Sequence, residues 1–435
     1  MPSRSTKGVR LALATAVAIG ASAIVLSAGT GVAEASPCGN SGSGSSQGFG
    51  SSEPSAQPQG PQGPLPAYSG TISKVLSWVT GPKSNNDTYN RFAISGTDLG
   101  IAWDNGSGQT LMAFGDTFGN CTVAGQQWRH NVLLRTDDDD FSDDTITIPD
   151  GVAGDANSGT VIAPGEPNYA QELIPSLGLD FVEVTTIPTA AISLPLPGGG
   201  HRQYINYMSV RKWGSTGNWD TNFSAIAYSD NNGQTWVTDQ STILVNSPLP
   251  VSLALPFDLP PAEYNNGKFQ QNAYARGKPG DDHIYQFGTP NGRFGAAFLA
   301  RFKPEDILHL DRYEYWAGSS RGWVDNISEI PDDGSARVVT QPVTELSVSW
   351  SPYLNKYIML DGDNGIRLRT ADNPQGPWSN PRTIVPAGNP VLYAPMMLPT
   401  SPALKATDTG KYLYFNASRW SDYNVMLIRS DLSKL

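Results

Sequence analysis

Two aspartates, Asp98 and Asp116, lie nine residues on either side of position 107 in a segment that predicts a β-hairpin. The apolar runs LGIAW and TLMAF are typical of strands, and Asn-Gly-Ser-Gly at 105–108 is typical of a hairpin loop. In such a hairpin the two side chains fall nearly opposite each other, on one face. Two carboxyl groups on one face could hydrolyse a glycosidic bond, one as general acid and one as base or nucleophile. The structural alternative is a turn residue and a strand-end cap.

The first 35 residues have the three parts of a secretory signal sequence. Three basic residues before position 11 are followed by the apolar run LALATAVAIGASAIVL and by Ala-Glu-Ala at 33–35, which is typical of a cleavage site. We therefore expect a secreted or cell-envelope protein. A membrane anchor is the alternative, but this run is short and Ala-rich and no other apolar run is long enough to span a bilayer, so we expect no stable membrane insertion.

The acidic net charge of the chain disfavours negatively charged binding partners. The formal net charge is −11, and removal of residues 1–35 takes away three positive charges and one negative charge, which leaves −13. Such an acidic protein is repelled by nucleic acid and by anionic membranes, so we expect neither as a partner. The absence of H-E-x-x-H and G-x-x-x-x-G-K-[ST] motifs disfavours zinc metalloproteases and nucleotide enzymes.

Residues 36–67 predict a disordered tether, because they are rich in Gly, Ser, Pro and Gln and poor in apolar side chains. The folded domain is then expected at 68–435. The two cysteines, Cys38 and Cys121, could form one disulfide in an exported protein and fix the tether to the hairpin. Two unpaired cysteines or an intermolecular bond are the alternatives.

A set of three consecutive strands recurs five times and predicts an all-β fold, a five-bladed β-propeller. The first strand of each set is expected at GTDLGIAW (96–103), IPTAAISL (187–194), FQQNAYAR (269–276), TELSVSWS (344–351) and LYAPMMLP (392–399). The segment SDNNGQTW at 229–236 is similar to the Asp-box hairpin of sialidase-like propellers, with Asn231 in the Asp position. We expect a structural role for it.

The first strands of a propeller line the central axis and run in one direction, so the polar residues at their starts should converge at one mouth. Asp116 is expected to join them from the second strand of the first blade, and the segment that follows it should border the mouth. The residues expected to bind substrate there are Arg129, Asn131, Gln271, Asn272, Glu345 and Tyr393. A surface charge is the alternative for Arg129.

The aromatic content fits a carbohydrate ligand. All 11 Trp residues follow the tether, and aromatic rings stack on the apolar faces of sugars. Most of these rings are nevertheless expected in the blade cores. The acidic run at 137–144 could bind calcium, but it is more typical of a solvated turn between strands, and we expect no metal and no cofactor.

The chain resembles the DUF4185 domain family, grouped as glycoside hydrolase family 183 and common in actinobacteria. The resemblance rests on GTDLG and, eighteen positions after its Asp, the Asp of FGDTFG. It continues in order through WRHNVLLRT, YMSVRKWG, AYSDNNGQTW, QNAYAR, GTPNGRFGAAFLARF, ELSVSWSPY, YAPMM and YFNASRW. Two departures are Leu398 after YAPMM, where a histidine is expected, and Asn231.

The resemblance implies a five-bladed propeller and an endo-acting D-arabinanase. Such an enzyme would cut α-linked D-arabinofuranosyl chains of mycobacterial-type arabinogalactan or lipoarabinomannan, a cell-wall polysaccharide, with inversion and without a metal. The matching positions make Asp98 and Asp116 the catalytic pair. From the apolar neighbours Phe114 and Phe118 we expect Asp116 to be the acid and Asp98 the base. A lectin-like propeller that holds glycan without cutting it and a sialidase-like glycosidase are the alternatives.

Overall fold

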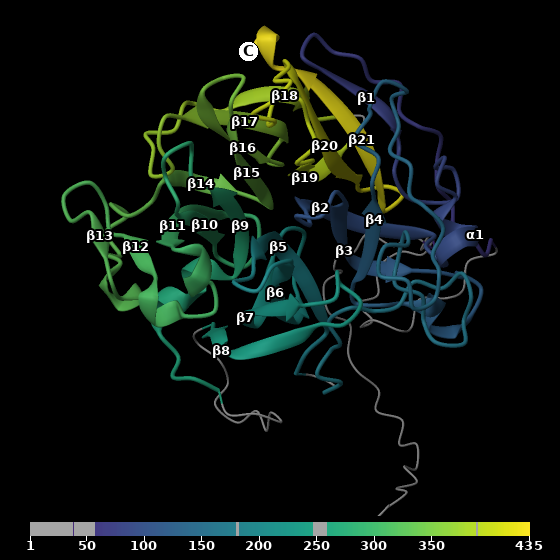
Figure 1. The fold of residues 1–435 in the computed structure, drawn as a ribbon, viewed down its shortest axis with the longest axis horizontal. Helices are drawn as coiled ribbons and strands as arrows, with labels where there is room; N and C mark the ends of the chain where they lie inside the picture. Colours follow the sequence, from purple (N-terminus) through teal and green to yellow (C-terminus); the bar gives the residue numbers. More distant parts are fainter. Residues whose placement is uncertain (1–37, 39–56, 180–181, 247–258, 389) are drawn as a thin grey trace, which may run out of the picture.

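The computed structural model describes residues 38, 57–179, 182–246, 259–388 and 390–435. The predicted signal sequence and residues 39–56 of the predicted tether lie outside the described residues. The described part holds 21 strands in five antiparallel sheets around a common centre, as Figure 1 shows. The predicted five-bladed propeller is confirmed. Among the described residues, no helix is long and apolar enough to cross a membrane.

Each sheet forms one blade, numbered here in chain order. Blade 1 contains β2 (Gly96–Asp104), β3 (Thr110–Phe118) and β4 (Val132–Thr136). Blade 2 contains β5 (Thr185–Pro195), β6 (His201–Trp213), β7 (Trp219–Ser229) and β8 (Val237–Val245). Blade 3 contains β9 (Gln271–Arg276), β10 (Ile284–Thr289), β11 (Gly295–Phe302), β12 (Glu314–Trp316) and β13 (Trp323–Val324), and β14 (Val339–Val343) pairs with β11.

The last two blades complete the ring. Blade 4 contains β15 (Leu346–Ser351), β16 (Lys356–Asp361), β17 (Gly365–Ala371) and β18 (Arg382–Pro386). Blade 5 contains β19 (Leu392–Met397), β20 (Tyr412–Arg419), β21 (Asn424–Asp431) and the N-terminal strand β1 (Ser73–Trp78). The helices are α1 (Thr88–Phe92) and the 3-10 helices η1 (Ala124–Gln127), η2 (Tyr264–Phe269), η3 (Pro304–Asp306), η4 (Leu310–Arg312), η5 (Ile327–Glu329) and η6 (Leu432–Lys434).

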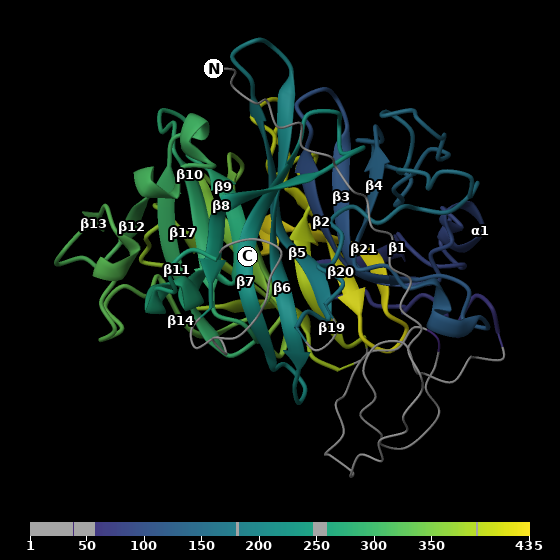
Figure 2. The same cartoon turned by 90° about the horizontal axis from the view of Figure 1, so that it is seen from below.

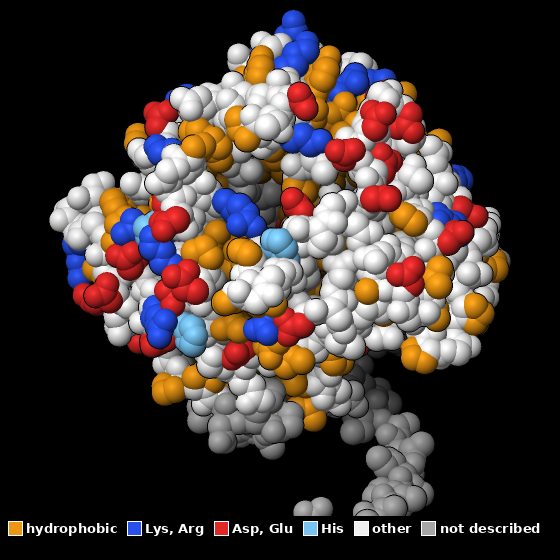
Figure 3. Space-filling model, in the orientation of Figure 1, with side chains coloured by type: hydrophobic (Ala, Val, Ile, Leu, Met, Phe, Trp, Pro, Cys, Tyr) orange, Lys and Arg blue, Asp and Glu red, His pale blue; other side chains and the backbone are white. Residues whose placement is uncertain are grey.

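The inner strands β2, β5, β9, β15 and β19 form a closed ring, because each packs against the inner strands of both neighbouring blades. Tyr393 and Thr185, at the starts of β19 and β5, contact Asp98 and Asp116, so these strand starts lie at the same end of the ring. Figure 2 shows the blades from the side. On the face seen in Figure 3 the surface is hollowed near the middle of the ring, and acidic, basic and histidine side chains border the hollow.

Strand β1 closes the propeller by pairing antiparallel with β21, so the N-terminal strand completes the C-terminal blade. A side-chain hydrogen bond also links the two strands, because the hydroxyl oxygens of Ser73 and Ser430 lie 2.6 Å apart. The sequence pattern did not predict this strand. Pairing the two ends of the chain leaves no open edge on β21 and holds the ring shut.

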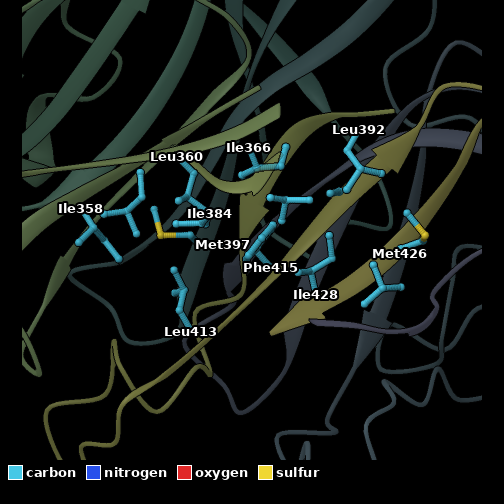
Figure 4. Packing of buried hydrophobic residues seen from close by; sticks show 14 of the residues in the cluster. Ile358, Leu360, Ile366, Ile384, Leu392, Met397, Leu413, Phe415, Met426 and Ile428 are labelled. Carbon is cyan, nitrogen blue, oxygen red and sulfur yellow. The ribbon is translucent and has the colours of Figure 1, made fainter. Parts of the chain in front are cut away.

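The core lies between the blades, where the faces of adjacent sheets meet. Figure 4 shows one such cluster, formed by side chains of blades 4 and 5. Ile358, Leu360 and Ile366 of blade 4 pack in the same cluster as Met397 and Phe415 of blade 5. These side chains come from alternate positions of their strands, and their burial is the main force that fixes one blade against the next.

Part of the predicted tether is ordered, which corrects the expected boundary at residue 67. Gln62 is buried and donates to the Thr80 carbonyl (3.0 Å), and the Gly63 amide donates to Asp422 (2.6 Å). Cys38 and Cys121 form a disulfide, with their Cα atoms 5.3 Å apart. Leu65 also packs against the core cluster of blades 4 and 5, so this segment docks through polar, apolar and disulfide contacts to the propeller.

The Asp-box segment has a structural role, as predicted. Asn231 Oδ1 accepts a hydrogen bond from the Thr235 amide (3.0 Å) and one from the Ser229 hydroxyl (2.9 Å). An asparagine can serve here because the motif needs only an acceptor oxygen at this point. The neighbouring Asn232 donates to Gln109 (2.9 Å) and links blade 2 to the hairpin of blade 1.

Candidate active site

The β2–β3 hairpin has the predicted register on both sides of Asp98 but is irregular beside it. Thr97 pairs with Thr117, and Ile101 pairs with Ala113, whereas the ladder shifts at Leu99. Leu99 and Gly100 both have a positive φ, 71° and 72°. This bulge turns Asp98 out of the regular ladder, a common way to aim a functional side chain.

The Asp98 carboxyl group lies against the backbone of β3. A Cβ atom added at Gly115 would stand only 2.6 Å from Asp98 Oδ1. Any side chain at position 115 would therefore push the carboxyl group away. The glycine directly before Asp116 is thus the residue that lets Asp98 approach the strand that carries Asp116.

Asp98 is partly buried and has a pKa raised to about 7. Loss of hydration is the largest cause, and the nearby negative charge of Glu345 adds to it. The hydroxyl groups of Tyr393 (3.0 Å to Oδ2) and Tyr423 and the charge of Arg293 act in the opposite direction. Asp98 Oδ1 is buried and has no hydrogen-bond partner among the described residues. A carboxyl group in this setting holds its proton close to neutral pH.

Glu345 and Tyr393, both predicted at the mouth, lie beside Asp98 together with a residue that the sequence pattern missed. Arg293, in the turn between β10 and β11, donates to Glu345 from Nη2 (2.7 Å) and Nε (2.9 Å). Its guanidinium group stands over the rings of Tyr393 (4.8 Å) and Trp420 (5.1 Å). The signal for Arg293 was a basic residue inside the glycine-rich turn GTPNGRFG, which sequence alone does not separate from a surface charge.

Asp116 lies at the end of β3, almost fully buried, with two donors on one oxygen. Trp128 Nε1 donates to Oδ1 at 3.0 Å, and the Thr185 hydroxyl donates to the same atom at 2.6 Å. Hydrogen bonds to a carboxylate stabilise its ionised form. The environments of the two carboxyl groups thus differ, and they differ in the opposite sense to the one expected from the sequence neighbours of Asp116. The apolar neighbours of Asp116 in sequence do not define its environment, because the groups that donate to it come from another strand and a loop.

Tyr423 connects the two aspartates and was also missed. It follows β20, and its hydroxyl group lies close enough to Asp98 to lower the pKa of that carboxyl group and is influenced by the charge of Asp116 as well. Burial raises its pKa well above the ordinary value, so the hydroxyl group stays neutral. Tyr423 has φ 52°, a strained conformation for an aromatic residue. Such strain is found mostly where a side chain must be held for function.

Arg129 and Asn131 have structural roles, which corrects their predicted place in the substrate site. Arg129 is buried and donates to the Ala170 carbonyl (3.0 Å) and to the Ala93 carbonyl (2.5 Å). Asn131 donates to the Thr186 carbonyl (2.9 Å) and accepts from two backbone amides of the segment before β5. Both tie loops to blade 1, because buried backbone groups need partners.

Gln271 and Asn272 are corrected in the same way. Gln271 is buried, and its Nε2 donates to the carbonyls of Pro290 (2.9 Å) and Gly292 (2.7 Å), so it supports the turn that carries Arg293. Asn272 is buried between blades 2 and 3, where it donates to Asn206 (2.9 Å). Strand starts do converge at one mouth, but only some of their polar side chains face it.

The acidic run at 137–144 serves turns and ion pairs. Asp138 accepts from the Thr147 amide (2.7 Å), and Asp144 pairs with Lys74 (3.1 Å). Asp281, Asp282 and His283 form a group whose possible ligand atoms lie within 4.8 Å of one another. Asp281 already contacts His283 Nδ1 (2.8 Å), so this group has a structural explanation.

A family model described as "Domain of unknown function (DUF4185)" matches residues 83–429. The chain belongs to this family. Notoamide biosynthesis cluster protein J of Aspergillus sp. (strain MF297-2) is 25% identical over 346 residues, which cover 78% of this chain and 83% of that protein.

Two solved structures are similar at greater distance. A proposed hydrolase from Bacteroides ovatus has a TM-score of 0.49 and 13% identity, with 79% of this chain and 88% of that chain covered. The native arabinanase Arb43A of Bacillus subtilis has a TM-score of 0.38 and 11% identity, with 77% and 96% covered. At this distance neither likeness carries an argument about the substrate of this DUF4185 protein.

Proposed function

We propose that this protein is a secreted glycoside hydrolase in which Asp98 is the general acid and Asp116 the general base. One observation carries the proposal: two carboxyl groups on adjacent strands stand in opposite environments. Burial raises the pKa of Asp98 to about 7, whereas two hydrogen-bond donors stabilise the ionised form of Asp116. Two carboxyl groups whose environments favour opposite protonation states are typical of acid and base partners in one site.

In the proposed reaction Asp98 gives its proton to the glycosidic oxygen as the bond to the anomeric carbon breaks. Asp116 takes a proton from a water molecule, whose oxygen forms the new bond to that carbon from the opposite side. The products are a free hemiacetal of inverted configuration and a shortened glycan. Afterwards Asp98 is ionised and Asp116 is protonated, and exchange with solvent resets both. Tyr423, beside both groups, keeps them in position.

The proposed substrate is the D-arabinan of mycobacterial-type arabinogalactan or lipoarabinomannan, cut within the chain. The resemblance of the ordered motifs supports this choice, and the aromatic residues beside Asp98 suit a sugar ring. Trp420 packs edge-on against Tyr393 with ring centroids 5.1 Å apart, so an apolar wall adjoins the acid.

Incubation with purified arabinogalactan tests the proposal. We expect released arabinose oligosaccharides of several lengths, with the newly formed anomer inverted when products are followed by NMR at early times. Asp98→Asn and Asp116→Asn should each lower turnover by about 10²–10⁴-fold, because each removes one proton transfer while keeping side-chain volume. Binding to arabinan without release of any product would instead identify a lectin-like propeller. Retention of configuration would refute the assignment of Asp116 as base.

A further inference from the structure

A hydrogen-bonded chain runs from Asp116 through Thr185, at the start of β5, to His130. The Thr185 hydroxyl donates to Asp116 Oδ1 at 2.6 Å, and His130 Nδ1 lies 3.1 Å from the same hydroxyl oxygen. The His130 amide donates to Glu172 Oε2 at 2.8 Å, which fixes the backbone that carries the imidazole. The Trp128 ring packs edge-on against the His130 ring, with centroids 4.3 Å apart, while its Nε1 donates to Asp116.

The direction of the chain follows from the proton count. A threonine hydroxyl can donate only one hydrogen bond, and here Thr185 donates it to Asp116 Oδ1. The Thr185 oxygen can then only accept from His130, so His130 must carry its proton on Nδ1. If Asp116 were instead protonated and donating to Thr185, the hydroxyl would donate to a bare Nδ1, and the His130 proton would sit on Nε2. The tautomer of His130 thus reports whether Asp116 Oδ1 accepts from the Thr185 hydroxyl or donates to it.

We propose that His130 and Thr185 are positioning residues that hold Asp116 ionised, through a chain from His130 Nδ1–H to the Thr185 hydroxyl and from that hydroxyl to Asp116. The mechanistic meaning of this chain rests on the proposed function, in which Asp116 is the base. The hydrogen bonding itself does not depend on the substrate.

The surroundings favour this direction. Burial lowers the pKa of His130 to about 4, so the ring is neutral at neutral pH and has only one proton to place. Its Nε2 lies 3.8 Å from Glu172 Oε2, too far for a hydrogen bond that would hold the proton there. Among the described residues, the titratable groups that face the chain include Tyr423 at Asp116 and Glu172 at His130. Arg129 and Glu183 lie beside Glu172.

Ring-nitrogen NMR of the unaltered protein tests the chain without any substrate. The sequence has four histidines, and the His130 signals are assigned by their loss in His130→Asn. We expect the neutral Nδ1–H tautomer for His130 between about pH 6 and 8. The Nε2–H tautomer would overturn the proposal, and it would do so even if arabinan proved to be the wrong substrate.

Substitutions then test the effect on catalysis. Thr185→Val removes the donor to Asp116, and His130→Leu removes the donor to Thr185. Each should move the acidic limb of kcat/KM to higher pH, by about one unit for Thr185→Val and less for His130→Leu, because the ionised base loses a direct or an indirect hydrogen bond. Thr185→Ser and His130→Asn keep a donor at the same place and should leave the limb near its normal position.

Thr186→Val is the matched control, since the hydroxyl of this adjacent residue donates to the Ile174 carbonyl (2.9 Å) and not to Asp116. It should cost thermal stability without moving the acidic limb. An equal shift in the control, or an unmoved limb in folded Thr185→Val, would show that the chain is merely structural. If Thr185→Val or His130→Leu does not fold, the tautomer alone decides. Failure of the unaltered protein to release any oligosaccharide would refute the proposed function and leave the tautomer result in force.

Discussion

Removal of one hydroxyl group, in Tyr393→Phe, should raise the pH at which activity is lost. The Tyr393 hydroxyl donates to Asp98 Oδ2 at 3.0 Å and lowers the pKa of that carboxyl group. Without the donor the ionised form of Asp98 is less stable, so the acid keeps its proton to a higher pH. The phenyl ring keeps the packing against Trp420, so the change is confined to the hydrogen bond.

The magnitude follows from the strength of a hydrogen bond to a charged group, about 1.5–3 kcal/mol. One pKa unit corresponds to about 1.4 kcal/mol, so complete loss would raise the pKa by about one to two units. The Tyr423 hydroxyl remains beside Asp98, which favours the lower end. Since the pKa of Asp98 is about 7, a rise of about one unit makes roughly half of the acid protonated at pH 8, against roughly a tenth in the unaltered protein.

The assay is kcat/KM on soluble arabinan from pH 4 to 9. The ratio of kcat/KM of Tyr393→Phe to that of the unaltered protein should rise about fivefold between pH 6 and pH 8, whatever the absolute rate of the variant. Tyr207→Phe is the matched control, because this buried hydroxyl contacts Thr238 (3.0 Å) away from the aspartates. A basic limb that stays in place or moves to lower pH in folded Tyr393→Phe would refute Asp98 as the acid.

Three further outcomes are expected. Glu345→Gln removes a negative charge that raises the pKa of Asp98 and leaves Arg293 unpaired, so the basic limb should move to lower pH; an unchanged profile would contradict this. The melting temperature of Asp98→Asn minus that of the unaltered protein should be larger at pH 8 than at pH 4. The folded protein holds the Asp98 proton up to about pH 7 and the unfolded chain releases it near pH 4, so stability falls across that interval and the amide is spared the loss. Equal differences at both pH values would argue against a buried acid. Replacing Cys38 and Cys121 by Ala should lower the free energy of unfolding by about 2–4 kcal/mol, because their disulfide closes a loop across 83 positions. The value of kcat should stay unchanged. A clear loss of kcat in the folded variant would place the disulfide in the site.

The sequence by itself determined the fold of this protein and the location of its candidate pair. Strand periodicity and the fivefold recurrence of one unit specify a propeller, because both are local patterns that repeat along the chain. The spacing around the Asn-Gly-Ser-Gly loop placed Asp98 and Asp116 on adjacent strands, since hairpin register is set by the loop. The starts of the inner strands brought Glu345 and Tyr393 to Asp98, as the repeat predicted.

The tertiary structure decided which side chains face one another, and with them the chemistry. The contacts of Asp98 and Asp116 include Thr185, Arg293 and Tyr423, which come from blades or turns far away in the sequence. No periodic pattern in the sequence predicts their position. A pKa depends on hydration and on groups within a few ångströms, so the neighbours of Asp116 in sequence could not reveal the groups that contact it in the fold. The same limit explains Arg129 and Asn131: sequence shows a polar residue near a mouth, but only the fold shows whether it bonds a buried carbonyl or faces the cavity.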